Sequence, residues 1–141
     1  MSTDTAKTLV STYIEDVWNR ADAQAFDRLT APAFAYCLGG QPPRDRAAML
    51  AFLQGVHAAF PDWRVQIDDI VAEGNTVAVR WSGQVTHEGP FHGIPATGKR
   101  IAVSGVNLYR IEDGRIAQEW EQMDSLGMLA QLGVLPPAGK S

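Results

Sequence analysis

The chain has 141 residues, which suits a single domain with one hydrophobic core. Its formal net charge of −4, without a cluster of Lys or Arg, argues against a nucleic-acid partner, and no apolar run reaches membrane-spanning length. A single cysteine, Cys37, excludes an internal disulfide, and the N-terminus does not resemble a signal peptide, so we expect a cytoplasmic protein. We predict one domain over residues 1–135 and a loose C-terminal tail over residues 136–141.

The first part of the chain has helical hydrophobic periodicity. A first helix is predicted to begin near Asp4 as its N-cap, and its apolar stripe contains Leu9, Val10, Tyr13, Ile14, Val17 and Trp18. A short second helix ends before Pro32, and residues 34–36 follow as a short strand. After a Gly- and Pro-rich loop, a third helix is predicted from its N-cap Asp45 to Pro61, which stops it.

The hydrophobic period then changes from helical to two, which predicts antiparallel strands. Residues 64–68 form the first of these strands, and a turn at 73–75 leads into a long strand over residues 76–87. The face of the long strand that we expect to be buried carries Val77, Val79, Trp81, Val85 and His87. A Gly- and Pro-rich connection follows at 88–99, and a last short helical turn is predicted at 127–133.

Residues 100–124 predict two further strands joined by a tight turn. We favour a three-residue loop, Glu112-Asp113-Gly114, with its glycine in the left-handed conformation. Side-chain alternation then gives one face that carries Ser104, Val106, Leu108, Arg110, Ile116, Gln118, Trp120, Gln122 and Asp124. A two-residue turn at the Asp-Gly pair would place Asn107 and Tyr109 there instead. The first set is too polar for a core and too aromatic for a solvent face, so we interpret it as the wall of a pocket.

Helices followed by consecutive antiparallel strands predict an α+β domain. A strongly curved sheet wrapped around the N-terminal helices would close a cone with one open mouth. The interior of such a cone suits a small apolar ligand.

Several short motifs extend this interpretation: Phe60-Pro61-Asp62, Thr86-His87-Glu88-Gly89, Gly93 to Lys99, Tyr109 to Ile116, Trp120 with Asp124, and Gln131-Leu132-Gly133. In this order they resemble the SnoaL-like polyketide cyclases, or ester cyclases, of the nuclear transport factor 2-like superfamily. The resemblance covers most of the chain. It implies the cone fold, a homodimer or higher homo-oligomer, and ring closure of an aromatic polyketide ester by intramolecular aldol condensation, without a metal or a cofactor.

The resemblance places the family's acid/base aspartate at Asp124. Aldol closure needs a proton removed from a carbon next to a carbonyl and a proton returned to the new alkoxide. One carboxylate can do both if an apolar pocket raises its pKa. Asp124, on the predicted face of Trp120, is therefore our candidate catalytic residue. The alternative is that Asp124 caps the last helical turn, which begins directly after it.

We predict five substrate-binding residues: Arg110, His87, Gln118, Trp120 and Gln122. Arg110, near the position of a histidine in the characterised cyclases, would hold a substrate oxygen or an enolate; alternatively it forms an ion pair at the edge of the sheet. His87 would donate to a substrate carbonyl or be a structural histidine that holds the following loop. Trp120 would supply the apolar environment. Gln118 and Gln122 would orient a polar group or be ordinary strand residues, and relatives often carry an acid at Gln118.

His87 and His92 lack a convincing third ligand, so we expect no metal site, and the resemblance implies that no cofactor is used. The favoured hypothesis is a small cyclase that acts on an apolar or aromatic carbonyl substrate. One alternative is an isomerase or an epoxide hydrolase of the same superfamily, but epoxide opening wants a second carboxylate, and none is visible on the face of Asp124. The other alternative is a non-catalytic module that binds a small ligand.

Overall fold

We analysed a computed structural model, which describes residues 2–134; the predicted tail over 136–141 lies outside them. In chain order the elements are α1 (Thr3–Tyr13), a π-helical segment η1 (Ile14–Asn19), α2 (Ala23–Leu29), β1 (Thr30–Leu38), α3 (Arg46–Ala59), β2 (Gln66–Glu73), β3 (Thr76–Thr86), β4 (Arg100–Glu112), β5 (Arg115–Met123) and α4 (Ser125–Leu132). None of the helices in this described part is long and apolar enough to cross a membrane.

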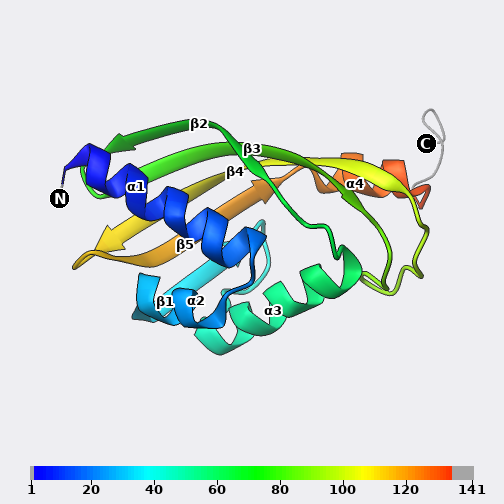
Figure 1. The fold of residues 1–141 in the computed structure, drawn as a ribbon, viewed down its shortest axis with the longest axis horizontal. Coiled ribbons are helices and arrows are strands. Elements are labelled where there is room, and N and C mark those ends of the chain that lie inside the picture. Colours follow the sequence, from blue (N-terminus) through cyan, green and yellow to red (C-terminus); the bar gives the residue numbers. More distant parts are fainter. Residues whose placement is uncertain (1, 135–141) are drawn as a thin grey trace.

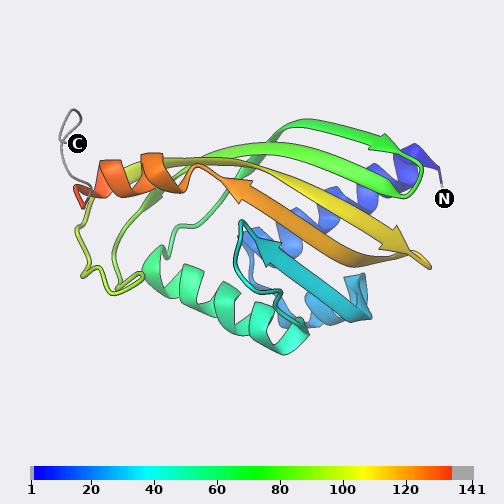
Figure 2. The same ribbon diagram turned by 180° about the vertical axis from the view of Figure 1, so that it is seen from behind.

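The five strands form one curved sheet in the order β1-β5-β4-β3-β2. β1 pairs with β5 in parallel, and the other neighbours are antiparallel. Helices α1, α2 and α3 lie on the concave side, and α4 follows the end of β5 (Figures 1 and 2). The predicted α+β fold, with a strongly curved and mostly antiparallel sheet around N-terminal helices, is therefore confirmed.

The ends of the predicted helices are partly correct. Asp45 caps α3 as predicted, because its carboxylate accepts a hydrogen bond from the Ala48 N–H at 2.9 Å. The predicted N-cap Asp4 is wrong: Ser2 caps α1 and accepts from the Thr5 N–H at 3.1 Å. β1 is also longer than the predicted strand at 34–36, since an edge strand tolerates a proline such as Pro32.

The hairpin between β4 and β5 differs from our preferred loop. Asp113 and Gly114 form a two-residue turn with φ of 51° and 75°, as the twist of a type I′ hairpin requires. Ile111 pairs with Ile116, but Arg110 pairs with Gln118, so β5 contains an extra residue at the start of the strand. This irregularity is a β-bulge, and it changes which side chains of β5 face inwards.

The predicted pocket wall is on the wrong side of the sheet. Val106 and Leu108 are 48% and 37% exposed, so the face they share with Arg110, Gln118 and Trp120 points outwards. The inward face of β4 and β5 carries Asn107, Tyr109, Glu119 and Glu121, which are buried. β4 has this orientation because its alternate residues Ile101, Val103, Tyr109 and Ile111 belong to the hydrophobic core.

The buried face of the long strand is confirmed. Val77, Val79, Trp81 and Val85 of β3 belong to the core, and His87, directly after the strand, is also buried. Aromatic side chains from α1, α2 and β1 complete the inner end of the cone: Tyr13 packs against Phe26 and Phe34, with ring centroids 6.5 Å apart in both pairs.

Candidate active site

A cavity of about 470 Å³ lies inside the cone, within the range of small-molecule sites. Apolar and aromatic side chains dominate its walls: Trp18, Phe52, Val56, Phe60, Trp63, Phe91, Met128 and Leu129. Exposed residues line its mouth: Gly39, Gly40, Gln41, His92, Gln122 and Ser125. The predicted hollow between sheet and helices is therefore present, and its walls suit a planar apolar ligand.

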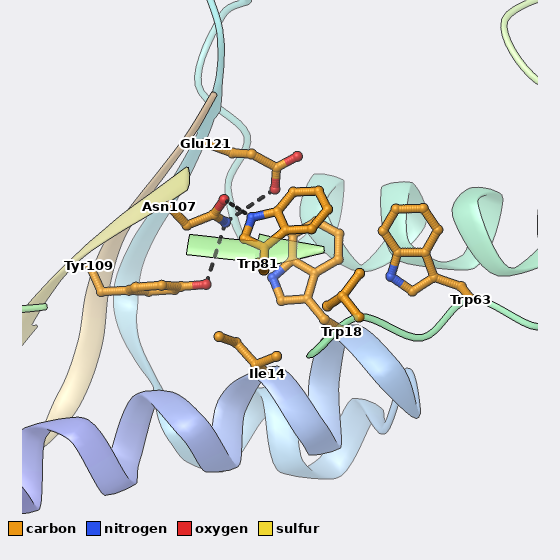
Figure 3. Close-up of a pocket in the computed structure, with 8 residues that line it drawn as sticks. Ile14, Trp18, Trp63, Trp81, Asn107, Tyr109 and Glu121 are labelled. Atoms are coloured by element: carbon orange, nitrogen blue, oxygen red, sulfur yellow. Dashed lines mark hydrogen bonds between the residues drawn. The ribbon is translucent and has the colours of Figure 1, made fainter. Parts of the chain in front are cut away.

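A second, much smaller space of about 10 Å³ lies at the inner end (Figure 3). Its polar lining consists of Asn107, Tyr109 and Glu121, and its apolar lining comes from η1, from the segment before β2 and from β3. Trp18, Trp63 and Glu121 line both spaces. Glu121 thus stands where the large cavity meets the buried polar residues.

Two carboxyl groups lie side by side in this interior. Glu119 and Glu121 are two residues apart on β5, so their side chains point to the same face of the sheet. Glu119 is fully buried and Glu121 is 5% exposed. Buried carboxyl groups are strongly unfavourable unless donors surround them or a proton neutralises them.

Glu119 is surrounded by donors. Its carboxylate accepts hydrogen bonds from the Tyr13 hydroxyl at 2.7 Å, the Trp18 indole at 2.8 Å and the Asn107 amide at 2.9 Å. Burial raises the pKa of Glu119, and these donors counteract that rise because they favour the charged form. Of the two carboxyl groups, Glu119 is therefore the one whose charged form has more hydrogen-bond donors around it.

The π-helical segment explains how two donors from one helix reach the same carboxylate. Tyr13 and Trp18 are five residues apart, which would place them about 140° apart around an α-helix of 3.6 residues per turn. In η1 the turn is wider, so residues five apart come close to alignment. The π-helical distortion thus allows both side chains to donate to the Glu119 carboxylate.

Asn107 connects the two carboxyl groups. Its side-chain oxygen accepts from the Trp81 indole at 2.8 Å, which fixes the orientation of the amide. Its nitrogen is then free to donate to Glu119 at 2.9 Å and to Glu121 at 3.1 Å. Both carboxyl groups are held in place by a residue that is itself locked.

The surroundings of Glu121 favour its neutral form. Burial, followed by the nearby negative charge of Glu119, raises the pKa of Glu121 to about 8. The two carboxyl groups titrate as a coupled pair, and the raised pKa favours the protonated form of Glu121 at neutral pH. A group with a pKa near the working pH, at the wall of an apolar cavity, is suited to general acid/base chemistry.

Asp124, our candidate catalytic residue, is not in the cavity. It is exposed, and its carboxylate accepts a hydrogen bond from the Gly127 N–H at 2.9 Å as the N-cap of α4. The prediction that it points into a dry pocket is wrong, and the alternative of a helix cap is confirmed. β5 ends at Met123, so the chain has already left the inner face at this position.

The predicted substrate-binding residues of the hairpin are mostly on the outer face. The Arg110 guanidinium lies 5.4 Å from the ring centre of Trp120, and Gln118 pairs with Arg110 across the strands. These three residues do not line the cavity, and their contact with a substrate stays a prediction that the structure does not support. Gln122 does line the cavity, at its mouth.

His87 has the structural role that was its alternative. It is buried, and its Nδ1 accepts a hydrogen bond from the Thr97 N–H at 3.2 Å. The backbone N–H of His87 also donates to the Lys99 carbonyl at 2.9 Å, so the residue holds both ends of the loop over 88–99. It does not line the cavity. Within residues 2–134 no group of acidic, His and Cys side chains is arranged to hold a metal ion.

Sequence reasoning missed the two glutamates. Simple alternation from the buried Ile116 places Gln118, Trp120 and Gln122 inside, and the bulge at Ala117 shifts this set outwards. The available signal was the Glu-x-Glu pattern itself, in a strand that must bury one face. In a strand without the bulge, regular alternation would place both glutamates on the solvent-facing side.

The fold and the cavity define a small α+β cone with a buried pair of carboxyl groups, and comparison with known proteins gives the family. Residues 8–132 match the SnoaL-like polyketide cyclase family. The chain therefore belongs to the SnoaL-like polyketide cyclases.

Three relatives illustrate the similarity, two of them named as cyclases and one as a hydroxylase. The "Probable cyclase otaY" of Aspergillus carbonarius is 29% identical over 124 residues, which span 82% of this chain and 100% of the relative. The crystal structure of IdmH from Streptomyces antibioticus, named as a candidate polyketide cyclase, is 34% identical with a TM-score of 0.80 over 92% of this chain and 99% of its own. AclR from Streptomyces galilaeus, named as a candidate hydroxylase, is 29% identical with a TM-score of 0.85 over 96% and 100%.

Proposed function

We propose that this protein is a cofactor-independent cyclase that closes a ring in a polyketide-like carbonyl substrate, with Glu121 as the acid/base residue. One observation carries the proposal: the buried carboxyl group of Glu121 lines the inner end of a cavity with mostly apolar walls, where burial and Glu119 raise its pKa to about 8. The cyclase names of two relatives support the same reaction class.

The reaction balances with one carboxyl group. The ionised form of Glu121 removes a proton from a carbon next to a carbonyl, which leaves an enolate. The enolate carbon attacks a second carbonyl of the same molecule, so one carbon–carbon bond forms and one C=O becomes an alkoxide. Glu121 then returns its proton to that alkoxide, and the product is an isomer of the substrate.

The cavity supports an aromatic substrate. Trp18, Phe52, Phe60, Trp63 and Phe91 contribute rings to its walls, and such walls favour a flat ligand. Exclusion of water from this interior also strengthens the interaction of Glu121 with developing charge. The small polar space next to Glu121 would receive the reacting oxygen rather than the apolar body of the substrate.

A product assay tests this function. Incubation of the protein with a panel of aromatic polyketide esters that carry a free ketone should give a ring-closed isomer faster than the reaction without protein, as followed by liquid chromatography and mass spectrometry. Proton NMR of the product should show that the α-carbon that formed the new bond has lost one proton. A moved double bond without a new ring would indicate an isomerase. Binding without product, and without exchange of α-protons in heavy water, would indicate a ligand-binding module and contradict the proposal.

A further inference from the structure

Trp63 differs from the other tryptophans of the cone interior in that its indole N–H has no acceptor. The Trp18 indole donates to Glu119 and the Trp81 indole donates to Asn107, each at 2.8 Å. Trp63 is 7% exposed, and among residues 2–134 its N–H meets no hydrogen-bond partner. An unpaired buried donor of this kind is rare and costs roughly 1–3 kcal/mol.

The residue that carries this unpaired N–H lies at the cavity. Trp63 lines both the large cavity and the small space at its inner end, as Glu121 does. Figure 3 shows the indole nitrogen on the edge of the ring that faces Trp18 and the other pocket residues. The indole N–H can only donate, so a ligand that pairs with it needs an acceptor atom.

Trp63 is also held firmly in place. The backbone N–H of Trp63 donates to the Phe60 carbonyl at 2.9 Å. The indole ring packs against the rings of Phe60, Trp18 and Trp81, with centroids 5.9, 6.5 and 6.4 Å away. The preceding residue, Asp62, accepts from both the backbone and the hydroxyl of Thr86 at 2.8 Å, which anchors the turn to β3. A donor fixed before the ligand arrives needs little reorganisation.

We propose that the indole N–H of Trp63 binds the carbonyl oxygen of an aromatic ketone or ester in the cavity and stabilises that oxygen when it becomes an enolate. The assignment of the enolate rests on the proposed function; the assignment of the carbonyl ligand rests on the unpaired donor alone. With its oxygen on Trp63, a ligand carbonyl would present its neighbouring carbon to the same end of the cavity as Glu121. Trp63 would then favour substrates that carry a carbonyl oxygen, and Glu121 would remove the proton from the carbon next to that carbonyl.

The first test uses wild-type protein and two probes of nearly the same shape. 2-Acetylnaphthalene offers a carbonyl, and 2-ethylnaphthalene does not. In ¹H–¹⁵N spectra the indole signal that disappears in Trp63→Phe belongs to Trp63. In the wild-type protein we expect the ketone to move the Trp63 indole N–H signal downfield. The hydrocarbon should cause no such downfield shift.

The second test compares affinities for the two probes. Trp63→Phe should weaken ketone binding about two- to tenfold more than hydrocarbon binding, the range of one net hydrogen bond. Trp120→Phe, the same change on the outer face, should leave the preference for the ketone unaltered. A ketone that fails to bind or to move the Trp63 signal, or a preference that survives in Trp63→Phe, would overturn the proposal. Because both tests measure binding only, a protein that passes them without forming product would contradict the proposed function alone.

Discussion

Glu121→Gln should lower the turnover of any ester that the wild-type protein cyclises by about 10²- to 10⁴-fold, the usual contribution of general acid/base catalysis. Glutamine has the shape of the protonated carboxyl group but cannot exchange a proton. Because Glu121 is largely neutral at neutral pH, the fold should tolerate the change. Steady-state kinetics, with circular dichroism to confirm the fold, would measure the effect.

Asp124→Asn is the matched control, since asparagine is as good an N-cap as aspartate. We expect its turnover to stay within about twofold of the wild-type value, as for a surface substitution with little effect on the fold. The pH dependence adds a second readout. The reactive form of Glu121 is the ionised one, so kcat/KM should rise with pH and level off above a pKa of about 8. If Asp124→Asn lost most of its turnover while Glu121→Gln stayed fully active, the catalytic residue would be Asp124 and not Glu121.

Glu119→Gln should reduce the free energy of unfolding by about 2 to 4 kcal/mol. Three donors, from Tyr13, Trp18 and Asn107, point at its carboxylate. A glutamine side chain offers one acceptor oxygen and brings an NH₂ group of its own, so at least one buried donor loses its partner. Urea denaturation of the two proteins at neutral pH would measure the difference.

Glu112→Gln provides the comparison for this stability effect. Glu112 is exposed at the end of β4, next to the hairpin turn, so the same chemical change there should alter the unfolding free energy by less than about 0.5 kcal/mol. If Glu119→Gln were as mild as Glu112→Gln, the donors around Glu119 would not be the organising feature of the interior that we describe.

The fold could be predicted because hydrophobic periodicity determines it. The helical stripe from Leu9 to Trp18, the N-cap Asp45 and the alternation through β3 all follow from which side chains must leave water. The resemblance of the loop and hairpin motifs to one family then agreed with that architecture. These features depend on many residues at once, so a local error at Asp4 or in β1 did not disturb them.

The site could not be predicted because it depends on single-residue details of the backbone. One inserted residue in β5 exchanged the two faces of the strand beyond it, which replaced Trp120 with Glu119 and Glu121 at the inner wall. The π-helical segment, which aligns Tyr13 and Trp18, has no recognisable pattern in the sequence. Asp124 illustrates the same limit, since one residue past the end of β5 separates a cavity wall from a helix cap.

A ¹³C NMR titration of protein labelled at the glutamate side-chain carboxyl groups tests the central claim most directly, with Glu121→Gln to assign the signal. The account predicts one carboxyl signal, absent from the variant, that changes with a midpoint near pH 8. That midpoint would show that the cavity holds a neutral acid at neutral pH. A Glu121 signal that titrates with the exposed glutamates, and is therefore fully ionised at neutral pH, would contradict the account.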